Sequence, residues 1–210
     1  MSIFSWFAEN FDLPILDWIA EHLHCGFLDK VMPLITLLGD AGIFWIAIAV
    51  VLLFFPKTQK MGLSMGAALL LGVVICNIIM KPAFARIRPY DYQLEHFGKT
   101  IQLLVATPHD FSFPSGHTIA SFEAATAIAI HNKKWGIPAL VLACLIAFSR
   151  LYLYVHYPTD VLASVVLGIG FAFLGSWMVK KGYEIKSQHK NHYVILANKE
   201  YVENALGSVQ

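Results

Sequence analysis

Three short clusters of polar residues stand at the ends of long apolar runs in this chain of 210 residues. The clusters are KPAFARIRP at 81–89, PSGH at 114–117 and SRLYLYVHYPTD at 149–160. Between them they supply two histidines, an aspartate and several permanently charged cations. Histidine can attack phosphorus or carry a proton, and fixed cations stabilise the charge of a phosphoryl group. The combination predicts hydrolysis of a phosphate ester without a metal ion.

Three cations, Lys81, Arg88 and Arg150, are expected to hold the phosphate oxygens. Lys81 and Arg88 are seven residues apart, which puts them on the same face if the segment is helical. Arg150 ends a later apolar run at the same rim. A single cation at the end of a span would be explained by snorkelling to headgroups, but three beside histidines indicate an anion site. Arg86 points away from Lys81 on a helix, and it is expected to snorkel.

The PSGH cluster is expected to open a helix. Ser115 is a natural N-cap, and Gly116 allows an oxyanion to approach the backbone. Free N–H groups and the helix dipole would favour a phosphate there. His117 stands one or two residues further in, within reach of the same anion.

His156 and Asp160 form the last pair of interest. Pro158 fits the first turn of a helix, so Asp160 would lie about one turn inside that helix. A carboxylate there can accept the Nδ1 proton of His156 and present Nε2 as a nucleophile. The alternative is a structural hydrogen bond between the two residues at a helix start.

In this order, K-x6-RP, PSGH and SR-x5-H-x3-D resemble the three-part motif of the type 2 phosphatidic acid phosphatase superfamily. That superfamily includes membrane lipid phosphatases, bacterial undecaprenyl diphosphate phosphatases, glucose-6-phosphatase and soluble vanadium haloperoxidases. The match runs from Lys81 to Asp160 and holds at each motif position. The N-terminal helix and the tail are not covered by it.

The resemblance implies a role for each motif residue. His156 would attack phosphorus to form a phosphohistidine, and Asp160 would hold its ring. His117 would protonate the leaving oxygen and then act as base on the water that releases phosphate. The residues expected to bind the phosphoryl group are Lys81, Arg88, Arg150, Ser115 and Gly116. No cofactor is expected, and no carboxylate cluster of the metal-ligand type is present in the sequence.

The composition predicts a membrane protein, because 57% of the residues are hydrophobic and only 14% are charged. The predicted fold class is all-α, an integral membrane helical bundle with about five transmembrane helices. The expected spans are about 34–55, 61–80, from the PSGH cluster to 131, 136–155 and 158–179. Asp40, in a Gly-Asp-Ala-Gly interruption of the first span, is expected to cap the buried helix.

Residues 3–23 are apolar but are interrupted by acidic side chains, so a helix lying in the membrane interface is predicted there. The alternative is a sixth span. The chain divides into an N-terminal interfacial helix at 1–32, a catalytic transmembrane phosphatase domain at 33–180 and a cytoplasmic tail at 181–210. Cys25, Cys76 and Cys144 form no CxxC pair and predict no disulfide framework.

Lysine placement predicts the orientation of this multi-pass protein in the plasma membrane. One set of connections carries most of the lysines, and this set is expected to be cytoplasmic. The three polar clusters would then face the extracytoplasmic side. The net charge of +1 gives no reason to expect a nucleic-acid partner.

Other polar residues have less certain roles in the sequence. Asn77, one turn before Lys81, orients that lysine or makes an interhelical hydrogen bond. Glu123 lies within a predicted span, so a functional partner is expected, but the sequence names none. The outer loop carries residues that shape headgroup choice or are simply solvated. They are Asp91, Tyr92, Glu95, His96, Phe97, His109 and Asp110.

The predicted function is an integral membrane phosphatase that hydrolyses a lipid phosphate or diphosphate monoester at the outer leaflet. Undecaprenyl diphosphate is the best guess for the substrate, and phosphatidylglycerophosphate or phosphatidate is the alternative. A vanadate-dependent haloperoxidase is a weaker alternative, because its relatives are soluble and this chain has long apolar runs. A non-enzymatic lipid-binding or transport protein is weaker too, because all three motifs are kept. The expected partners are the lipid substrate and membrane lipids, and no oligomeric state is predicted.

Overall fold

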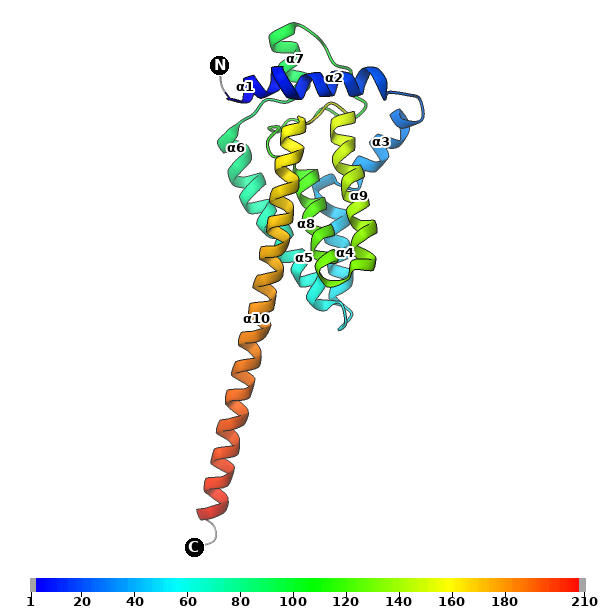
Figure 1. Ribbon diagram of the computed structural model, residues 1–210. Helices are drawn as coiled ribbons and strands as arrows, with labels where there is room; N and C mark the ends of the chain where they lie inside the picture. The colour runs from blue at the N-terminus through cyan, green and yellow to red at the C-terminus, as the bar shows by residue number, and fades with distance from the viewer. Residues whose placement is uncertain (1–2, 208–210) are drawn as a thin grey trace.

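The computed structural model describes residues 3–207 of the chain and the side chains of residues 3–189. The regular elements of this part are all helices, with no strand, which confirms the predicted all-α fold class. Figure 1 shows an upright bundle, a helical segment that crosses one end of it, and α10 extending well beyond the other end.

The N-terminal segment lies across the end of the bundle rather than alongside its helices (Figure 1). It consists of α1 (Ile3–Phe7), the π-helical η1 (Ala8–Asp12) and α2 (Leu13–His22). Its large exposed aromatic residues include Trp6, Phe11 and Trp18. Exposed aromatic rings beside acidic residues suit a membrane–water boundary. Among the described residues, this segment is not one of the stretches long and apolar enough to cross a membrane, and its interfacial position stays a prediction.

The bundle is built around α8, which packs against α5, α9 and α10. Its helices are α4 (Ile43–Leu53), α5 (Gln59–Gly72), α8 (Gly116–His131), α9 (Lys133–Tyr152) and α10 (Pro158–Gly207). Alanines of α8 that face the core are fully buried, as at Ala124 and Ala125. Small side chains let neighbouring helices approach closely, which is the usual packing between helices in a membrane. This packing fixes where the first turn of α8 lies relative to the ends of α9 and α10.

Three stretches among the described residues are long and apolar enough to cross a membrane: Gln59–Phe97, Lys133–Tyr152 and Pro158–His189. A fourth is obtained if the bent pair Leu28–Leu37 and Asp40–Leu53 is one span. Helix α8 lies in the same bundle but has only 16 residues. The membrane bundle is therefore confirmed, whereas the predicted number of five spans stays a prediction.

The bent pair is interrupted at the Gly-Asp-Ala-Gly sequence. Helix α3 (Leu28–Leu37) and α4 meet at an angle of 41° around the short 3-10 turn η2 (Asp40–Gly42). Ala41 has a φ of 48° and Gly42 a φ of 66°, so both lie in the left-handed region. The predicted capping role of Asp40 is wrong, because its side chain makes no capping hydrogen bond with α4.

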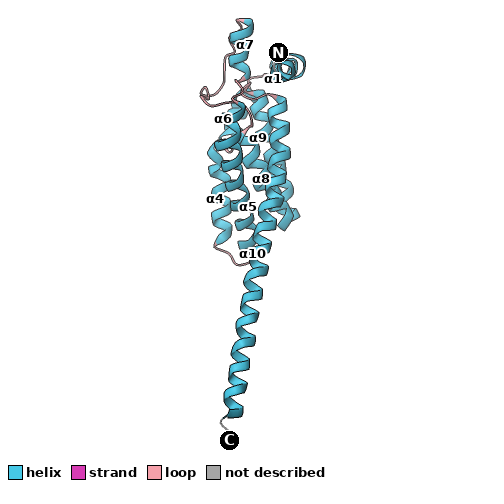
Figure 2. Cartoon of the chain, turned by 90° about the vertical axis from the view of Figure 1, so that its left-hand side faces the viewer, coloured by secondary structure: helices cyan, strands magenta, loops and turns pink. Residues whose placement is uncertain are grey.

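The connection from α5 to α8 runs over the end of the bundle that the N-terminal segment crosses. It passes through η3 (Val73–Met80), α6 (Lys81–Phe84) and α7 (Pro89–Phe97), and then through a loop at 98–115. Figure 2 shows α7 standing beyond the bundle end, beside the N-terminal helix. Within this connection, η3 belongs to the predicted span at 61–80, and the part from α6 onward is the long polar segment predicted from the sequence.

The boundaries predicted for the tail do not coincide with an element boundary. Helix α10 continues without interruption through residue 181 and past the rest of the bundle (Figure 2). Residues 1–2 and 208–210, which belong to the predicted terminal segments, lie outside the described residues.

Candidate active site

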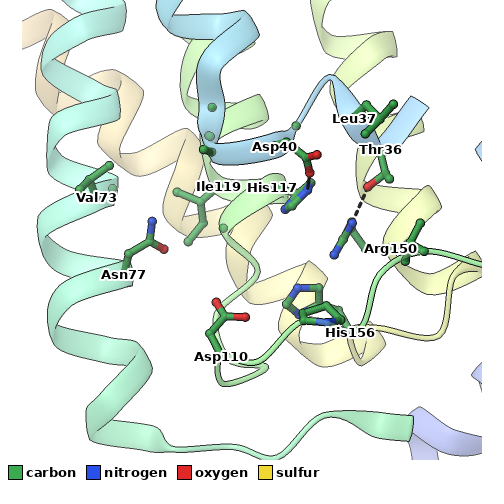
Figure 3. Close-up of a pocket in the computed structure, with 18 of the residues that line it drawn as sticks. Thr36, Leu37, Asp40, Val73, Asn77, Asp110, His117, Ile119, Arg150 and His156 are labelled. Carbon is green, nitrogen blue, oxygen red and sulfur yellow. Dashed lines mark hydrogen bonds and ion pairs between the residues drawn. The ribbon is translucent and has the colours of Figure 1, made fainter. Parts of the chain in front are cut away.

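The three polar clusters meet around one cavity at the end of the bundle. The cavity has a volume of about 690 Å³. Motif residues that line it are Lys81, Arg88, Gly116, His117, Arg150 and His156. Figure 3 shows His117, Arg150 and His156 around the same space, although they come from α8, α9 and the connection that follows α9. The structure thus brings together two histidines and three cations that are far apart in the sequence.

His156 is buried in the short connection between α9 and α10. Its Nε2 is 3.3 Å from Nη1 of Arg88, on the side of the cations. Its Nδ1 is 3.5 Å from Oγ of Ser112 and 3.7 Å from Oδ2 of Asp160. Burial, followed by the charges of Arg88 and Arg150, lowers the pKa of His156 well below its usual value. A neutral imidazole with Nε2 toward the cations is the form that can attack phosphorus.

Asp160 lies behind His156 and does not line the cavity. The separation of 3.7 Å from His156 is longer than a hydrogen bond. Ser112 donates its hydroxyl proton to Oδ2 of Asp160 and lies close to the same ring nitrogen. Ser112 is fully buried and was not identified from the sequence. The orienting role of Asp160 stays a prediction, with Ser112 placed to share it.

Arg86 joins Asp160 to the N-terminal helix. Its Nη1 donates to Oδ1 of Asp160, and its Nη2 donates to Oδ2 of Asp12 at 2.7 Å. Its guanidinium also lies 3.8 Å from the ring centroid of Tyr157. Asp12 in turn accepts the backbone N–H of Thr159 at 2.9 Å, in the first turn of α10. The predicted snorkelling of Arg86 is therefore wrong: the residue is buried and pairs with two buried carboxylates.

Lys81 and Arg88 both form ion pairs with Asp110 of the 98–115 loop. Arg88 also donates Nε to the backbone oxygen of Asp110 at 2.8 Å and Nη1 to that of Val155 at 2.6 Å. Burial acts to raise the pKa of Asp110, but hydrogen bonds and charges from Lys81 and Arg88 prevail and hold it well below its usual value. The Asp110 carboxylate is thus bound to Lys81 and Arg88, two of the cations that the sequence assigned to the phosphate oxygens.

Arg150 approaches the cavity from the end of α9. Its Nη1 donates to Oγ1 of Thr36, and the side chain is almost fully buried. Its Nε is buried and has no hydrogen-bond partner within the described part of the chain. A buried guanidinium with a spare donor at the cavity is suited to an anion that enters it.

Ser115 and Gly116 differ in what they offer to an anion. Ser115 is the predicted N-cap of α8, accepting from the backbone N–H and the hydroxyl of Thr118. Its own N–H donates to Oγ of Ser164 at 2.8 Å, and the residue is fully buried. Gly116 lines the cavity beside Asn77, whose Oδ1 would be 3.3 Å from a Cβ at that position. The structure therefore places Gly116, and not Ser115, at the cavity surface.

His117 contacts a carboxylate that the sequence did not assign to it. Its Nε2 is 2.7 Å from Oδ1 of Asp40, in the break between α3 and α4 (Figure 3). The two residues are separated by 77 positions in the chain, so no local pattern connects them.

The deeper part of the cavity is mostly apolar and reaches Glu123. Apolar residues that line the cavity include Leu34, Leu37, Ile46, Leu69, Val73 and Ile119. Glu123 is buried, and its Oε1 has no hydrogen-bond partner among the residues described. Gly72 makes room for this carboxyl group, since a Cβ there would lie 2.2 Å from Oε1. A charged rim above an apolar wall can accept a phosphate attached to a hydrocarbon chain.

The described residues contain no group of three or more His, Cys, Asp or Glu that could hold a metal ion. The charges available at the cavity rim are instead the three cations and the carboxylates of Asp40 and Asp110.

Comparison with known proteins points to one family. Residues 61–184 match the family described as the PAP2 superfamily. The undecaprenyl-diphosphatase of Sulfolobus acidocaldarius is 32% identical over 131 residues, which are 62% of this chain and 61% of that protein. The match therefore spans less than two thirds of that protein's length. The undecaprenyl-diphosphatase BcrC of Bacillus subtilis is 31% identical over 151 residues, which are 72% of this chain and 75% of that protein.

Two solved structures share the fold. LpxE of Aquifex aeolicus superposes with a TM-score of 0.67 and 25% identity, covering 83% of this chain and 98% of that one. The transmembrane PAP2 type phosphatidylglycerolphosphate phosphatase of Bacillus subtilis has a TM-score of 0.60 and 28% identity, covering 82% of this chain and 84% of that one. The similarity thus extends well beyond the three motifs.

Proposed function

Because the chain belongs to the PAP2 superfamily and is a membrane lipid phosphatase, we propose that it hydrolyses a lipid diphosphate, with undecaprenyl diphosphate as the preferred substrate. The observation that supports this most is the cavity, in which cations and histidines stand above an apolar wall. Two relatives with about 30% identity carry the name undecaprenyl-diphosphatase. A long isoprenoid chain has methyl branches and double bonds but no polar atom, so it needs little from the wall except apolar surface.

The proposed reaction has two displacements. Nε2 of His156 attacks the terminal phosphorus, the bond between that phosphorus and the lipid-side oxygen breaks, and His117 donates a proton to the leaving oxygen. Water then attacks the phosphohistidine and gives a proton to His117, so that inorganic phosphate leaves and both histidines return to their starting states. The short distance between Arg88 and Nε2 supports this assignment, because a phosphoryl group held by Arg88 lies next to the attacking nitrogen.

The cations supply the charge that the transition state needs. Lys81, Arg88 and Arg150 reach the cavity from three separate elements and surround the position of the phosphoryl oxygens. Fixed positive charge in a site with little water stabilises the developing negative charge without reorganisation. The phosphate of the substrate must displace the Asp110 carboxylate from Lys81 and Arg88 before these cations can bind it.

We further propose that the cavity opens on the extracytoplasmic side and that the lipid enters from the outer leaflet. The support is the lysine distribution. Lysines on the opposite end of the bundle have no ion pair within the described residues, at positions 57, 60, 133, 134 and 180. Lysine and arginine are in excess in the cytoplasmic connections of membrane proteins.

The second candidate substrate is phosphatidylglycerophosphate. It is favoured by the likeness to the solved phosphatidylglycerolphosphate phosphatase of Bacillus subtilis. The two candidates are separated by ranking kcat/KM for undecaprenyl diphosphate, phosphatidylglycerophosphate, phosphatidate and diacylglycerol diphosphate in the same detergent. A ranking led by either glycerolipid monophosphate would replace the proposed substrate.

Replacement of each histidine tests the reaction itself. Phosphate release from undecaprenyl diphosphate is measured in detergent with EDTA present. The variant His156→Ala is expected to lose at least about a thousandfold in kcat, because it lacks the nucleophile. The variant His117→Ala is expected to lose about a hundredfold or more, as general acid–base catalysis contributes that much.

His22→Ala is the matched control, since His22 is exposed on α2 and hydrogen-bonds only within its own helix. Its turnover should equal that of the unmodified protein. Turnover near the unmodified level in His156→Ala would overturn the proposed nucleophile, and dependence on added metal would overturn the proposed chemistry.

A further inference from the structure

The contact between Asp40 and His117 is not explained by packing or by helix capping. Oδ1 of Asp40 is 2.7 Å from Nε2 of His117, within ordinary hydrogen-bond distance. The carboxyl group makes no cap at either end of the turn that carries it. About half of the Asp40 side chain is exposed, so burial did not force the contact.

The backbone around Asp40 is shaped to permit this contact. A Cβ at Gly39 would lie 2.7 Å from Cδ2 of His117 and 2.9 Å from Cγ2 of Ile146, so only glycine leaves room for the ring. The next two residues, Ala41 and Gly42, adopt left-handed conformations. For Ala41, which has a Cβ, this conformation is costly by about 1 kcal/mol or more. The break between α3 and α4 therefore requires glycine at position 39 and a strained backbone at Ala41, and it places the Asp40 carboxylate against the His117 ring.

His117 otherwise faces positive charge. The charged and titratable groups around it are Arg150 from α9, Lys81 from α6, His156 from the connection before α10, and Asp40 from η2. Burial, followed by the charges of Arg150 and Lys81, lowers the pKa of His117 below its usual value. Asp40 is the carboxylate among these four groups, and its hydrogen bond and charge act in the opposite direction, so it limits this loss of proton affinity.

We propose that Asp40 is a positioning residue that strengthens the hold of His117 on its proton and keeps the ring turned for its role as general acid. This deepens the function proposed above and depends on it. With Nε2 bonded to Asp40, Nδ1 is the nitrogen that gives its proton to the leaving oxygen and later takes one from water. Asp40 is thus in direct hydrogen-bond contact with its imidazole, whereas Asp160 lies 3.7 Å from Nδ1 of His156.

The test is the pH profile of kcat/KM for Asp40→Asn, which keeps the size of the side chain and removes its charge. An acid must carry its proton, and loss of the carboxylate makes His117 lose that proton at lower pH. The alkaline limb of the profile should therefore move down by about one to two pH units. At pH 8 kcat should fall about tenfold or more, while KM changes little. Asp40→Glu, which restores the charge, should recover part of both losses.

A second readout separates acid catalysis from a purely structural effect. p-Nitrophenyl phosphate has a leaving group that needs little protonation, so Asp40→Asn should lose less activity on it than on the lipid diphosphate. Asp29→Asn is the matched control. The Oδ1 of Asp29 lies 3.0 Å from Nδ1 of His24, and neither residue lines the cavity. That variant should leave the pH profile unchanged.

The outcomes distinguish this inference from the proposed function. If the unmodified protein releases no phosphate from any lipid, the proposed function fails. If it does, and Asp40→Asn keeps the original alkaline limb and loses equally on both substrates, only the role of Asp40 is overturned. Thermal unfolding of each variant in detergent shows whether a loss of activity comes from misfolding. If Asp40→Asn is misfolded, the pH profile of Asp40→Glu decides whether Asp40 acts on His117.

Discussion

At the scale of single residues, Asp110 neutralises two of the cations that line the cavity. Its carboxylate is bound by Lys81 and Arg88, the cations that the proposed mechanism assigns to the phosphoryl oxygens. Because these partners hold the pKa of Asp110 below its usual value, the group is ionised at neutral pH. The folded value lies below the unfolded one, so the ion pairs add stability above about pH 4, and this is lost only as the pH falls toward the folded value. Mild acid therefore does not free the cations.

Asp110→Asn should strengthen inhibition by phosphate-like anions. The amide keeps the shape of the side chain but no longer competes for Lys81 and Arg88. The inhibition constant of orthovanadate is expected to fall by about tenfold, which corresponds to about 1.4 kcal/mol. It is measured by steady-state inhibition of phosphate release in detergent.

Asp91→Asn is the control for this prediction, because Asp91 lies in α7 and does not line the cavity. Unchanged inhibition in Asp91→Asn is expected. If Asp110→Asn binds vanadate no better than the unmodified protein, Asp110 does not stand in for the phosphate.

The residues that the sequence could identify are those whose role is local. Ser115 caps the helix that its neighbours begin, and the predicted cations do line the cavity with the two histidines. Arg86 was misplaced because helical periodicity was applied beyond the end of a helix. Helix α6 ends at Phe84, and Ala85 has a φ of 44°, so Arg86 turns inward instead of following the face opposite Lys81. Asp40 and Ser112 could not be found, since their partners are distant in the chain.

At the scale of elements, the N-terminal segment supports the active site. Through Asp12 it holds both Arg86 and the first turn of α10, and Arg86 in turn holds Asp160. Asp12 and Asp160 are fully buried, and Arg86 nearly so. Buried charges need all their partners, so loss of one carboxylate leaves an uncompensated guanidinium. A segment outside the three motifs thus supports the nucleophile His156.

Asp12→Ala should lower both stability and turnover. The free energy of unfolding is expected to fall by about 3 kcal/mol, as for other buried ion pairs that lose one partner. kcat should fall more than KM rises, because the substrate contacts remain while the support of His156 is weakened. Thermal unfolding and steady-state kinetics in the same detergent measure the two effects.

Glu21→Ala is the comparison for that prediction, since Glu21 is an exposed acidic residue on the same helix. Its effect should stay below about 0.5 kcal/mol, as for surface substitutions in general. Equal behaviour of the two variants would mean that the N-terminal helix does not act through Arg86.

Hydropathy predicted the membrane-spanning parts of elements better than their full lengths. The stretches at 136–155 and 158–179 correspond to α9 and to the first part of α10. The sequence did not predict that α10 runs to residue 207, because apolar composition marks the length in lipid and not the length of the helix. It also placed the start of the first span near residue 34, whereas α3 begins at Leu28 and is followed by a bend.

At the scale of the whole molecule, charge is distributed differently at the two ends. Basic residues near the cavity are largely neutralised, since Lys81, Arg86, Arg88 and Lys99 each form an ion pair with an aspartate. Among the residues whose side chains the structure describes, the lysines at the other end lack such partners, apart from Lys181, which pairs with Glu184. An excess of lysine in short connections marks the cytoplasmic side of a membrane protein, so the end with the cavity is the one expected to be translocated.

The native cysteines allow this orientation to be measured. Cys25 is exposed in the turn between α2 and α3, and its backbone N–H donates to the hydroxyl of Tyr152, which places it at the cavity end. In a variant carrying Cys76→Ala and Cys144→Ala, a membrane-impermeant maleimide added to intact cells should label Cys25. The same variant with Cys25→Ser and Lys57→Cys places a thiol at the other end, in the connection between α4 and α5. That thiol should react only after the membrane is opened, because the proposed orientation exposes only the cavity end to the outside. Labelling of Lys57→Cys but not of Cys25 in intact cells would show that the protein has the opposite orientation and that its substrate lies in the inner leaflet.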